Sequence, residues 1–571
     1  MAGHLFLLGF LVLFSGYIFY LLYSLALNYY RIKKAGLPIV ILPINCGSPL
    51  WMSIDTTLLP LFEHLPFGVK NFTRFNWRGW ELKDRYKAHQ ELGDIFVFVT
   101  PGKNWLQLCN AEAVTDVLTR KGRIHNARDQ AIEYLIGLFG DNVATTEGRQ
   151  WQRHRKITAS CFNEQPNALV WSESIRQATG MLQYWLSKSS IDSVANDART
   201  LSLHVIASAA FGQSYTFRGA DDVSTNDDRD SSSYKDSLKL VLDNCLPLAV
   251  IGLDNLDKWW LPNSWKELRQ ATITFKSHMR NLYEQEKQAM AQGKNRGNNL
   301  MSSLVRASQV DIQDTGDIGQ AGLTEQEIYG NMFEFNFAGH DTTANALCLG
   351  LVYLAARPDV QDWIHEEINA VLGDKKVEDS SYTESFPRLK RCLAVMYETV
   401  RLYSPSAILR TTGPKGRTLK VGDHTYVLPA HTMIVPSYSA LHTHPRYWGD
   451  NSLEWEPSRW IISNSPDVPS TILQTLDSEI FMEHPKDANP FIAWSVGGRV
   501  CPGKKLAQVE WVAVMASLFQ KYKVTPVLQD GEDEKAARQR LQLLIKKHTG
   551  FKLMLKLLRP EEAVLAWVQR F

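Results

Sequence analysis

This sequence has no closely spaced pair of cysteines, a net charge near zero and no internal repeat. None of its seven cysteines forms a C-x-x-C pair; they stand at positions 46, 109, 161, 245, 348, 392 and 501. This wide spacing argues against a disulfide framework, a zinc ribbon and an iron–sulfur cluster, and it favours a reducing compartment. A net charge of only +2 gives no reason to expect nucleic-acid binding. No G-x-G-x-x-G follows a predicted strand, so we expect no flavin or nicotinamide domain.

One stretch lacks charged side chains altogether. Residues 5–27 read LFLLGFLVLFSGYIFYLLYSLAL, without one Asp, Glu, Lys or Arg. About 20 such residues cross the hydrocarbon core of a bilayer. The cations Arg31, Lys33 and Lys34 follow this run, which is typical of a signal anchor with a cytoplasmic chain and not of a cleaved leader. We therefore predict a transmembrane helix over residues 1–30, in the endoplasmic reticulum membrane, with the rest of the chain facing the cytoplasm.

The remainder of the chain is predicted to contain a tether and one large domain. Prolines at 38, 43 and 49 indicate a stiff, basic and proline-rich tether over residues 31–52. Residues 53–571 form the predicted catalytic domain. Helical patterns dominate it, so we expect a mainly α fold with a smaller β region. The clearest strands lie in residues 95–109, around a Pro-Gly turn, and in residues 419–438, around a Gly-Asp turn.

The longest helix is predicted over residues 324–357. Thr324 and Glu327 form a capping box at its start, and Pro358 ends it or begins the next helix. At over 30 residues this helix is long for a globular protein. Apolar residues occur on all its sides, which predicts that it crosses the centre of the domain.

The middle of this helix combines two costly features. Ala338 and Gly339 remove side-chain bulk beside Asp341 and Thr342. A glycine there costs about 1 kcal/mol relative to alanine, and a carboxylate among apolar turns is unfavourable unless it is paired. The cluster indicates either a gap where a ligand lies against the helix, with an acid and a hydroxyl beside it, or a helix-packing notch with a satisfied Asp.

The stretch AWSVGGRVCPGKK surrounds Cys501 with glycines, one proline and a fixed cation, Arg499. An apolar amphipathic helix is predicted from Gly503 onward, so Cys501 stands at its N-terminus, where backbone amides stabilise a thiolate. Gly497 and Gly498 allow the loop to turn beneath a flat ligand. A single thiolate with no companion ligand fits a metal whose other ligands are not protein, such as a haem iron.

These residues resemble those of the cytochrome P450 haem-thiolate monooxygenases. The family signature F-x-x-G-x-R-x-C-x-G is matched with tryptophan in place of phenylalanine, by Trp494, Gly497, Arg499, Cys501 and Gly503. Four further motifs follow the family order: W-x-x-x-R (Trp151, Arg155), A-G-x-D-T-T (Ala338 to Thr343), E-x-x-R (Glu398, Arg401) and EPSRW (with Arg459). An E-x-x-R alone is usually a solvated pair, but the five motifs together are specific.

The resemblance implies a cytochrome P450 fold and a role for each matched residue. Cys501 would be the axial ligand of haem b. The haem propionates would be held by Trp151, Arg155, Arg499 and, by its distance from the E-x-x-R pair, Arg410. Ala338 and Gly339 would leave room for dioxygen, Thr342 would hydrogen-bond to the oxygen and Asp341 would relay protons. Glu398, Arg401 and Arg459 would be structural.

The resemblance also implies an external electron supply. An NADPH-dependent flavoprotein reductase on the same membrane is the expected partner, with cytochrome b5 as a further one. Lys504 and Lys505 either belong to a basic docking face or are ordinary solvated lysines. Alternatives to a monooxygenase are a haem-thiolate isomerase or dehydratase that needs no reductase, and a haem-binding sensor without turnover.

The substrate is expected to be a hydrophobic small molecule. Predicted wall segments are largely apolar: residues 124–141, residues 246–261, the central helix near Phe333 and Phe337, and residues 404–409. The tryptophan-containing signature resembles the filamentous-fungal branch of the family, in which secondary-metabolite biosynthesis is common. The sequence does not predict the position of oxidation.

Overall fold

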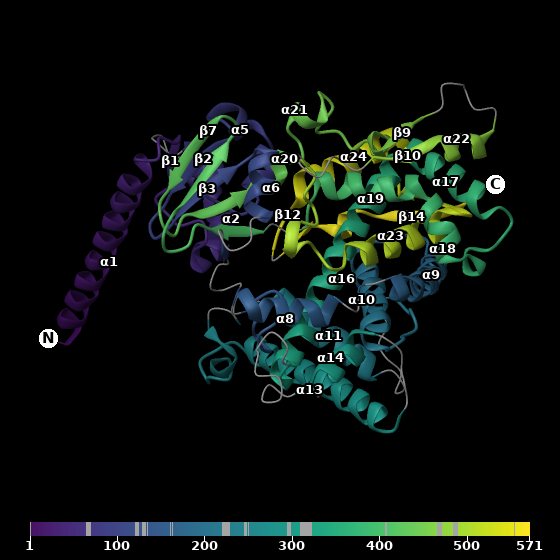
Figure 1. Ribbon diagram of the computed structural model, residues 1–571, viewed down its shortest axis with the longest axis horizontal. Coiled ribbons are helices and arrows are strands. Elements are labelled where there is room, and N and C mark those ends of the chain that lie inside the picture. Colours follow the sequence, from purple (N-terminus) through teal and green to yellow (C-terminus); the bar gives the residue numbers. More distant parts are fainter. Residues whose placement is uncertain are drawn as a thin grey trace. The chain divides into compact units, whose positions relative to one another are not determined.

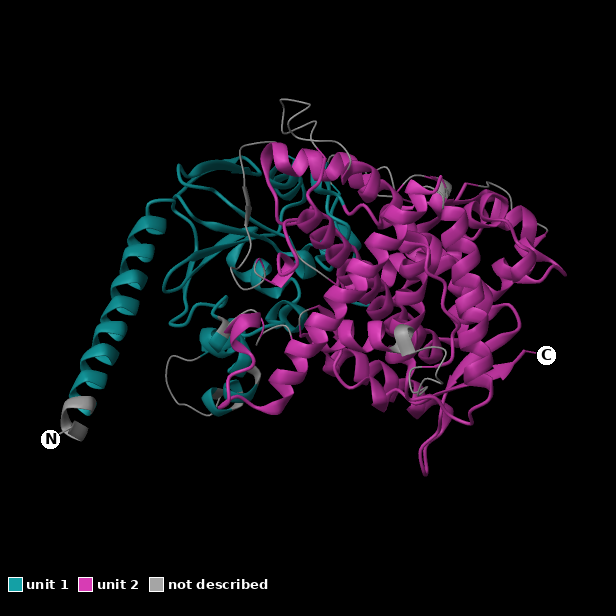
Figure 2. Ribbon diagram, turned by 90° about the horizontal axis from the view of Figure 1, so that it is seen from below, with its two compact units in different colours: residues 1–129, 407–454, 484–500 teal, residues 130–406, 455–483, 501–571 magenta. Residues whose placement is uncertain are grey.

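A computed structural model describes residues 2–63, 70–119, 125–127, 133, 135–159, 162, 164–219, 229–244, 248, 251–293, 299–308, 322–405, 408–464, 471–482, 489–552 and 554–570. The chain divides into two compact units (Figure 2). Unit 1 consists of residues 1–129, 407–454 and 484–500, and unit 2 of residues 130–406, 455–483 and 501–571. The domain predicted over residues 53–571 therefore contributes to both units.

Within the described residues, unit 1 contains a mixed sheet in the order β1-β2-β3-β8-β5-β4. Its strands are β1 (Ile39–Ile41), β2 (Ile95–Val99), β3 (Asn104–Leu108), β4 (His125–Ala127), β5 (Leu409–Thr411) and β8 (Met433–Pro436). β2 and β3 form the antiparallel hairpin expected around the Pro-Gly turn, with Phe98 opposite Trp105. β8 runs parallel to β3 and antiparallel to β5, and β4 pairs antiparallel with β5.

A second hairpin in unit 1 confirms the predicted Gly-Asp turn. Strands β6 (Arg417–Val421) and β7 (His424–Leu428) pair antiparallel, and Gly422 between them has a φ of 58°, a left-handed conformation that glycine adopts without strain. The described helices of this unit, besides α1, are α2 (Pro49–Glu63), α3 (Lys70–Phe75), α4 (Trp80–Asp84), α5 (Lys87–Leu92), α6 (Ala111–Thr119), α20 (Tyr438–Leu441), α21 (Pro445–Trp448) and the 3-10 turn η6 (Gly497–Arg499).

The predicted transmembrane helix is α1 (Ala2–Lys33), which extends beyond the sheet of unit 1 (Figure 1). Its segment Leu7–Lys33 is long and apolar enough to cross a membrane, and its most apolar window has no residue buried in the protein. The last turns differ, because they pack on the β2–β3 hairpin. Ser24 Oγ accepts a hydrogen bond from the Gly102 amide at 2.8 Å, and the Asn28 side chain donates to the Thr100 carbonyl at 3.0 Å.

The segment predicted as a tether is partly built into the sheet. β1 pairs parallel with β2, placing Val40 beside Phe98, and Leu37, Val40 and Leu42 are buried. Residues 37–42 are therefore an edge strand with its flanks and not a free connector. The proline pattern is local and does not reveal this pairing, because the partner strand is distant in sequence.

Unit 2 is mainly helical (Figure 1). Its described helices are α8 (Gly148–Ala159), α9 (Glu164–Leu186), α10 (Val194–Phe211), α11 (Arg229–Asp243), α13 (Asn263–Ala291), α14 (Leu300–Ser308), α16 (Glu325–Ala356), α17 (Pro358–Leu372), α18 (Tyr382–Ser385), α19 (Lys390–Leu402), α22 (Ile472–Ser478), α23 (Lys504–Phe519) and α24 (Glu534–His548), with short 3-10 turns η1 (Leu253–Asn255), η2 (Val377–Asp379), η3 (Phe386–Arg388), η4 (Pro457–Trp460) and η7 (Pro560–Glu562). Its described strands form three pairs: β9 (Ile461–Ser463) with β10 (Glu479–Phe481), β11 (Tyr522–Pro526) with β14 (Leu565–Gln569), and β12 (Thr549–Phe551) with β13 (Leu555–Leu557).

Helix α16 confirms the predicted central helix of unit 2. The Thr324 side chain accepts from the Glu327 amide, and the Glu327 side chain accepts from the Thr324 amide, so the capping box is complete. From Ile328 to the C-terminal end of the helix nearly every residue is buried. Pro358 takes the first position of α17, where its missing N–H would have no helical partner.

Candidate functional site

Cys501 stands directly before α23, the helix that begins at Lys504. Its side chain is exposed, whereas the other described cysteines are buried (Cys109, Cys348, Cys392) or half-buried (Cys46). The backbone amides of Gly503 and Lys504 donate toward the Cys501 sulfur. An accessible sulfur that receives amide hydrogens at a helix start is suited to carry negative charge and to bind a ligand.

The protein around this sulfur favours the neutral thiol. Surrounding protein atoms raise the pKa of the Cys501 thiol by desolvation, and the Glu334 carboxylate raises it further. The amides of Gly503 and Lys504 and the charge of Arg155 lower it, without cancelling the rise. A metal ion on the sulfur would reverse this balance, because coordination keeps a thiol deprotonated.

The donor set fits an iron porphyrin. Among the residues that the structure describes, no three His, Cys, Asp or Glu side chains gather into a group that could hold a metal ion. A metal at Cys501 would therefore take at most two described side chains of these types as ligands, and its remaining ligands would come from another molecule. A haem supplies four ring nitrogens and accepts one thiolate, which is the arrangement that these residues allow.

Helix α23 is buried on all sides, unlike the amphipathic helix that we predicted. Every residue from Gln508 to Phe519 is buried, and Glu510 lies among them. Burial raises the pKa of Glu510 to about 8, although a hydrogen bond from Ser202 Oγ at 2.6 Å partly opposes the rise. This buried acid, nine residues after Cys501, was missed by the sequence analysis; a lone Glu in an apolar helix is its only signal.

Trp151 and Arg155 lie one turn apart on α8, and both are half-buried. They therefore share a face of the helix. Arg155 is near enough to Cys501 for its charge to lower the pKa of the thiol. The two residues between them on the other face, Arg153 and His154, are buried, and they join α8 to the start of α16.

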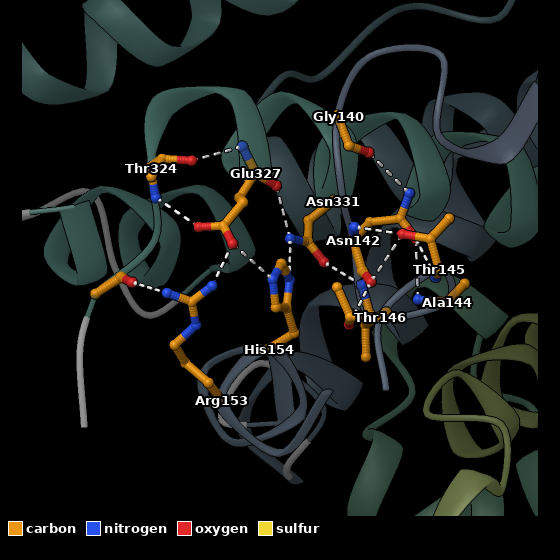
Figure 3. A network of polar contacts seen from close by, with 12 residues as sticks. Gly140, Asn142, Ala144, Thr145, Thr146, Arg153, His154, Thr324, Glu327 and Asn331 are labelled. Carbon is orange, nitrogen blue, oxygen red and sulfur yellow. Dashed lines mark hydrogen bonds and ion pairs between the residues drawn. The ribbon is translucent and has the colours of Figure 1, made fainter. Parts of the chain in front are cut away.

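The joint between α8 and α16 is a network of polar contacts (Figure 3). Arg153 forms an ion pair with Glu327 and donates to the Gly322 carbonyl at 3.0 Å. His154 Nε2 lies 3.3 Å from Glu327 Oε1, and His154 Nδ1 lies 2.9 Å from the Asn331 side-chain nitrogen. Glu327 thus links the capping box of α16 to two side chains of α8.

The hydrogen-bond directions in this network follow from one backbone amide. Asn331 Oδ1 accepts from the Val143 N–H at 3.0 Å, so the other atom of this amide group must be the nitrogen. That nitrogen donates to His154 Nδ1, which leaves the ring hydrogen on Nε2, facing Glu327. Burial raises the pKa of Glu327, but His154, the Thr324 amide and Arg153 outweigh burial and lower it to about 2.

Glu398 of α19 accepts hydrogen bonds from five donors. Arg401 binds both of its oxygens, at 2.7 and 2.8 Å, and Arg459 Nε binds Oε1 at 2.9 Å. The Glu456 amide and the Trp460 indole N–H complete the set at 2.8 and 3.1 Å. Burial raises the pKa of Glu398, but Arg401 and Arg459 lower it by more. The three residues expected from the E-x-x-R and EPSRW motifs are therefore brought together here.

Asp341 of α16 forms an ion pair with Arg199 of α10, in which 2.9 Å separates Oδ1 and Nε. Burial raises the pKa of Asp341, but Arg199 foremost, together with His340 and Lys556, lowers it below its ordinary value. The cluster predicted in mid-helix is thus split. Asp341 is buried against α10, whereas its neighbour Thr342 is partly exposed.

The small residues of α16 have different surroundings. A side chain built at Gly339 would come within 3.1 Å of Ile206 on α10, so this glycine allows two helices to approach closely. Ala338 is partly exposed, and its carbonyl accepts a hydrogen bond from Thr342 Oγ1 at 2.9 Å. Gly339 therefore fits the packing notch that we considered, and Ala338 with Thr342 fits the accessible gap.

The predicted wall residues Phe333 and Phe337 are turned into the core. They are 0% and 5% exposed and stack on each other at 6.1 Å between ring centres, within a cluster that includes Phe139 and Phe275. Glu334 is instead the partly exposed residue of this turn. Among the other predicted wall segments, residues 124, 128–132, 134, 246–247, 249–250 and 406–407 lie outside the described residues.

The predicted site residues of unit 1 occupy a sheet strand and the segment before Cys501. Gly497 has a φ of 77°, and a side chain there would meet the Leu118 carbonyl and Thr119 Cα at 3.0 Å. Its role in the loop is thus the close approach to the end of α6. Glycine is the one residue that satisfies both the backbone angle and this contact.

Three more predicted residues lie in unit 1. Arg410 is buried in β5 and donates to the Leu409 carbonyl at 3.1 Å. Trp494 packs edge-to-face on Phe491, with ring centres 5.7 Å apart. Arg499 ends the 3-10 turn η6 and is half-buried. The aromatic position of the cysteine signature is therefore anchored by a second aromatic ring.

Comparisons with known proteins agree with these features. A family model described as Cytochrome P450 matches residues 71–553. The chain is 29% identical over 554 residues to "Cytochrome P450 monooxygenase ORF6" of Penicillium roqueforti, covering 92% of each chain. It is 29% identical over 551 residues to "Cytochrome P450 monooxygenase prx9" of Penicillium rubens, again covering 92% of each. It is 28% identical over 535 residues to the "Phomenoic acid biosynthesis cluster cytochrome P450 monooxygenase" of Leptosphaeria maculans, covering 88% of this chain and 89% of that one.

Proposed function

Because the chain belongs to the cytochrome P450 family, we propose that it is a membrane-bound haem-thiolate monooxygenase that oxidises a hydrophobic small molecule. The observation that carries this proposal is the position of Cys501, an accessible sulfur that receives two backbone amides ahead of a buried helix. When bound, the haem would activate dioxygen so that one oxygen atom enters the substrate and the other leaves as water.

On the Cys501 side, the chain holds the cofactor and the charge of its ligand. The amides of Gly503 and Lys504 would share the negative charge of the sulfur. Trp151 and Arg155 on one face of α8 are suited to bind the haem propionates as charge-assisted donors. The motifs alone assign the same task to Arg410 and Arg499.

On α16, Thr342 and Asp341 would deliver protons to the reaction site. Thr342 Oγ1 places its hydrogen on the Ala338 carbonyl and keeps its lone pairs available to accept another hydrogen bond. Asp341 is held as a carboxylate by Arg199, so it can take a proton from water and pass it on when the ion pair opens. Because Thr342 is partly exposed and Asp341 is buried, Thr342 would face the substrate, and Asp341 would act without touching it.

The expected membrane and redox partners are inferred from the family and from helix α1. Helix α1 is a candidate membrane anchor, and we propose the endoplasmic reticulum membrane with both units on the cytoplasmic side. Electrons would come from NADPH through a flavoprotein reductase, with cytochrome b5 as an additional donor. The relative from a phomenoic acid biosynthesis cluster supports a role in secondary-metabolite biosynthesis.

The test of this proposal is the optical spectrum of the full-length protein. The reduced, carbon-monoxide-bound holoprotein should show the red-shifted band of a thiolate ligand, and Cys501→Ser should lose it while Cys46→Ser keeps it. NADPH consumption with reductase then separates a monooxygenase from a reductase-independent isomerase, dehydratase or sensor. A protein that binds no haem, or an unchanged band in Cys501→Ser, would overturn the proposal.

A further inference from the structure

Helix α2 of unit 1 presents an apolar face to its surroundings. Leu50, Ile54 and Leu61 are 74%, 43% and 66% exposed. Their spacing of four and seven residues places them on one face of the helix. Ser53 and Thr57 are also exposed and lie on the same side. We call these five residues the outer face of α2.

The outer face carries no charge. From residue 50 to residue 62 the only charged side chain is that of Asp55. It is buried, and it accepts a hydrogen bond from the Arg78 amide at 2.8 Å. A helix that faces water normally has charged residues on that side, as α5 of the same unit does with exposed Lys87, Gln90 and Glu91. The outer face of α2 therefore has the composition of a surface that something apolar covers.

The opposite face of α2 is packed against the protein. Trp51 and Leu59 are buried and form a cluster with Phe72 of α3. The Trp51 indole N–H also donates to the Asn76 carbonyl at 2.6 Å. These contacts fix the rotation of the helix, so the outer face cannot turn inward without breaking them.

The start of α2 and the last turns of α1 are held by the same hairpin of unit 1 (Figure 2). On β3, the Asn104 side chain donates to the Asn28 carbonyl of α1 at 3.2 Å. The next residue, Trp105, donates from its indole to Asn45 Oδ1 at 3.2 Å, shortly before α2 begins. Ser24 of α1 docks on the turn of this hairpin. Helix α2 therefore begins close to the place where α1 reaches unit 1.

We propose that the outer face of α2 lies on the lipid bilayer that α1 crosses, as a second membrane contact of unit 1. This inference rests on the proposed function, because it takes α1 as a membrane anchor. Leu50, Ile54 and Leu61 would enter the boundary between headgroups and acyl chains, where a helix with one apolar face lies in the plane of the membrane. With α1 alone, unit 1 can tilt on its anchor, whereas a second contact holds it at one orientation to the bilayer.

The bilayer is favoured over a second copy of the chain as the partner of this face. Both would supply an apolar surface, but the contacts of α1 and α2 with one hairpin bring the membrane to α2. Lipid also covers an uncharged helix face without requiring a complementary shape, and the outer face offers no charged group that would specify a protein partner.

Lipid contact can be mapped in the full-length holoprotein. The protein would be reconstituted in phosphatidylcholine nanodiscs that contain a phospholipid with a photoreactive diazirine on its acyl chain. After illumination and proteolysis, mass spectrometry locates the lipid adducts. We expect adducts in the apolar segment of α1 and on the outer face of α2, and none on α5, which serves as the internal control.

A triple variant tests the outer face itself. Leu50→Ser, Ile54→Ser and Leu61→Ser together should lower the yield of adducts on α2 about tenfold or more, because moving one such side chain out of water is worth about that factor. The adducts on α1 should remain. Lys87→Ser with Gln90→Ser on α5 is the matched control and should change neither set. A carbon-monoxide band at the wild-type position shows that each variant is folded.

The adducts on α1 separate this inference from the proposed function. If α1 receives none, the membrane anchoring in the proposed function is itself contradicted. If α1 is labelled but wild-type α2 is labelled no more than α5, only the second contact is overturned. Adducts on α2 that persist in the triple variant overturn it as well. A dimer that the triple substitution dissociates would assign the outer face to a second copy and would equally overturn the lipid contact.

Discussion

Arg199 on α10 and Asp341 on α16 form an ion pair whose side chains are only 17% and 12% exposed. The pair connects the acid expected to relay protons to a helix on which the sequence showed no family motif. Because Arg199 offsets the burial of Asp341, the state of this carboxylate depends on a residue outside the motifs.

Replacing Arg199 should therefore change the pH dependence of turnover. In Arg199→Gln, the burial that raises the pKa of Asp341 would lose its main opposing charge, so the pKa should rise. If activity needs the carboxylate, the acidic limb of the profile of kcat against pH should move to higher pH. Arg176→Gln removes an arginine that is 44% exposed and paired with Glu173, and it should leave the profile in place. Equal profiles for the two variants would contradict the coupling.

Thr342→Ala should preserve haem binding and uncouple the enzyme. The substitution removes the hydroxyl that bonds to the Ala338 carbonyl, so protons would no longer be delivered in an ordered way. We expect a several-fold lower yield of product per NADPH, with the difference recovered as peroxide. Thr342→Ser keeps an Oγ and should stay close to wild type. A wild-type yield in the alanine variant would show that the hydroxyl has no such role.

Glu398→Gln should destabilise unit 2 severely. Five donors converge on the two oxygens of Glu398, and an amide would turn its own hydrogens toward some of them while leaving two arginines less compensated. Breaking a buried ion pair costs about 3–5 kcal/mol, which urea denaturation of the holoprotein can measure. Glu366→Gln is the matched control, since that glutamate is 53% exposed against Arg391; a similar loss in both variants would argue against the special position of Glu398.

Glu510 should make the protein less stable as the pH rises. Its folded-state pKa of about 8 lies above the value of ~4.3 expected in the unfolded chain. Between these two values the folded state holds the proton and the unfolded state releases it, so the free energy of unfolding falls with rising pH. Glu510→Gln retains an acceptor for Ser202 and removes this dependence, so its advantage in melting temperature should be larger at pH 8 than at pH 5. An advantage that does not change with pH would show that Glu510 is not protonated in the folded state.

The sequence predicted elements whose signals are local. The capping box at Thr324 and the proline at 358 define α16 to within one residue, and turn residues placed both hairpins correctly. The rotation of α16 could not be predicted, because a helix that is apolar on all sides has no preferred inward face in its pattern. Phe333 and Phe337 were therefore expected on the substrate side, whereas the structure buries both and leaves Glu334 partly exposed.

Contacts between segments that are far apart in the chain could not be predicted from the sequence either. The pairing of β1 with β2, and the partner of Glu398 in η4, each depend on the folded chain; only the family resemblance suggested the second. Arg199 and Glu510 carry no motif that the sequence analysis used, and their roles arise from burial next to Asp341 and Ser202. The perturbed pKa of a buried acid or base can be recognised only when the residues around it in the folded chain are known.

The docking of α1 on the β2–β3 hairpin bears on how a soluble form could be prepared. Cutting the chain at residue 30 would remove Ser24 and Asn28, leaving the Gly102 amide and the Thr100 carbonyl without their present partners. A cut after Tyr23 keeps both, and the 22 residues of α1 that it removes would measure about 33 Å, enough for a hydrocarbon layer of ~30 Å. If α1 crosses a membrane, we therefore expect its lipid-embedded part to end before Ser24.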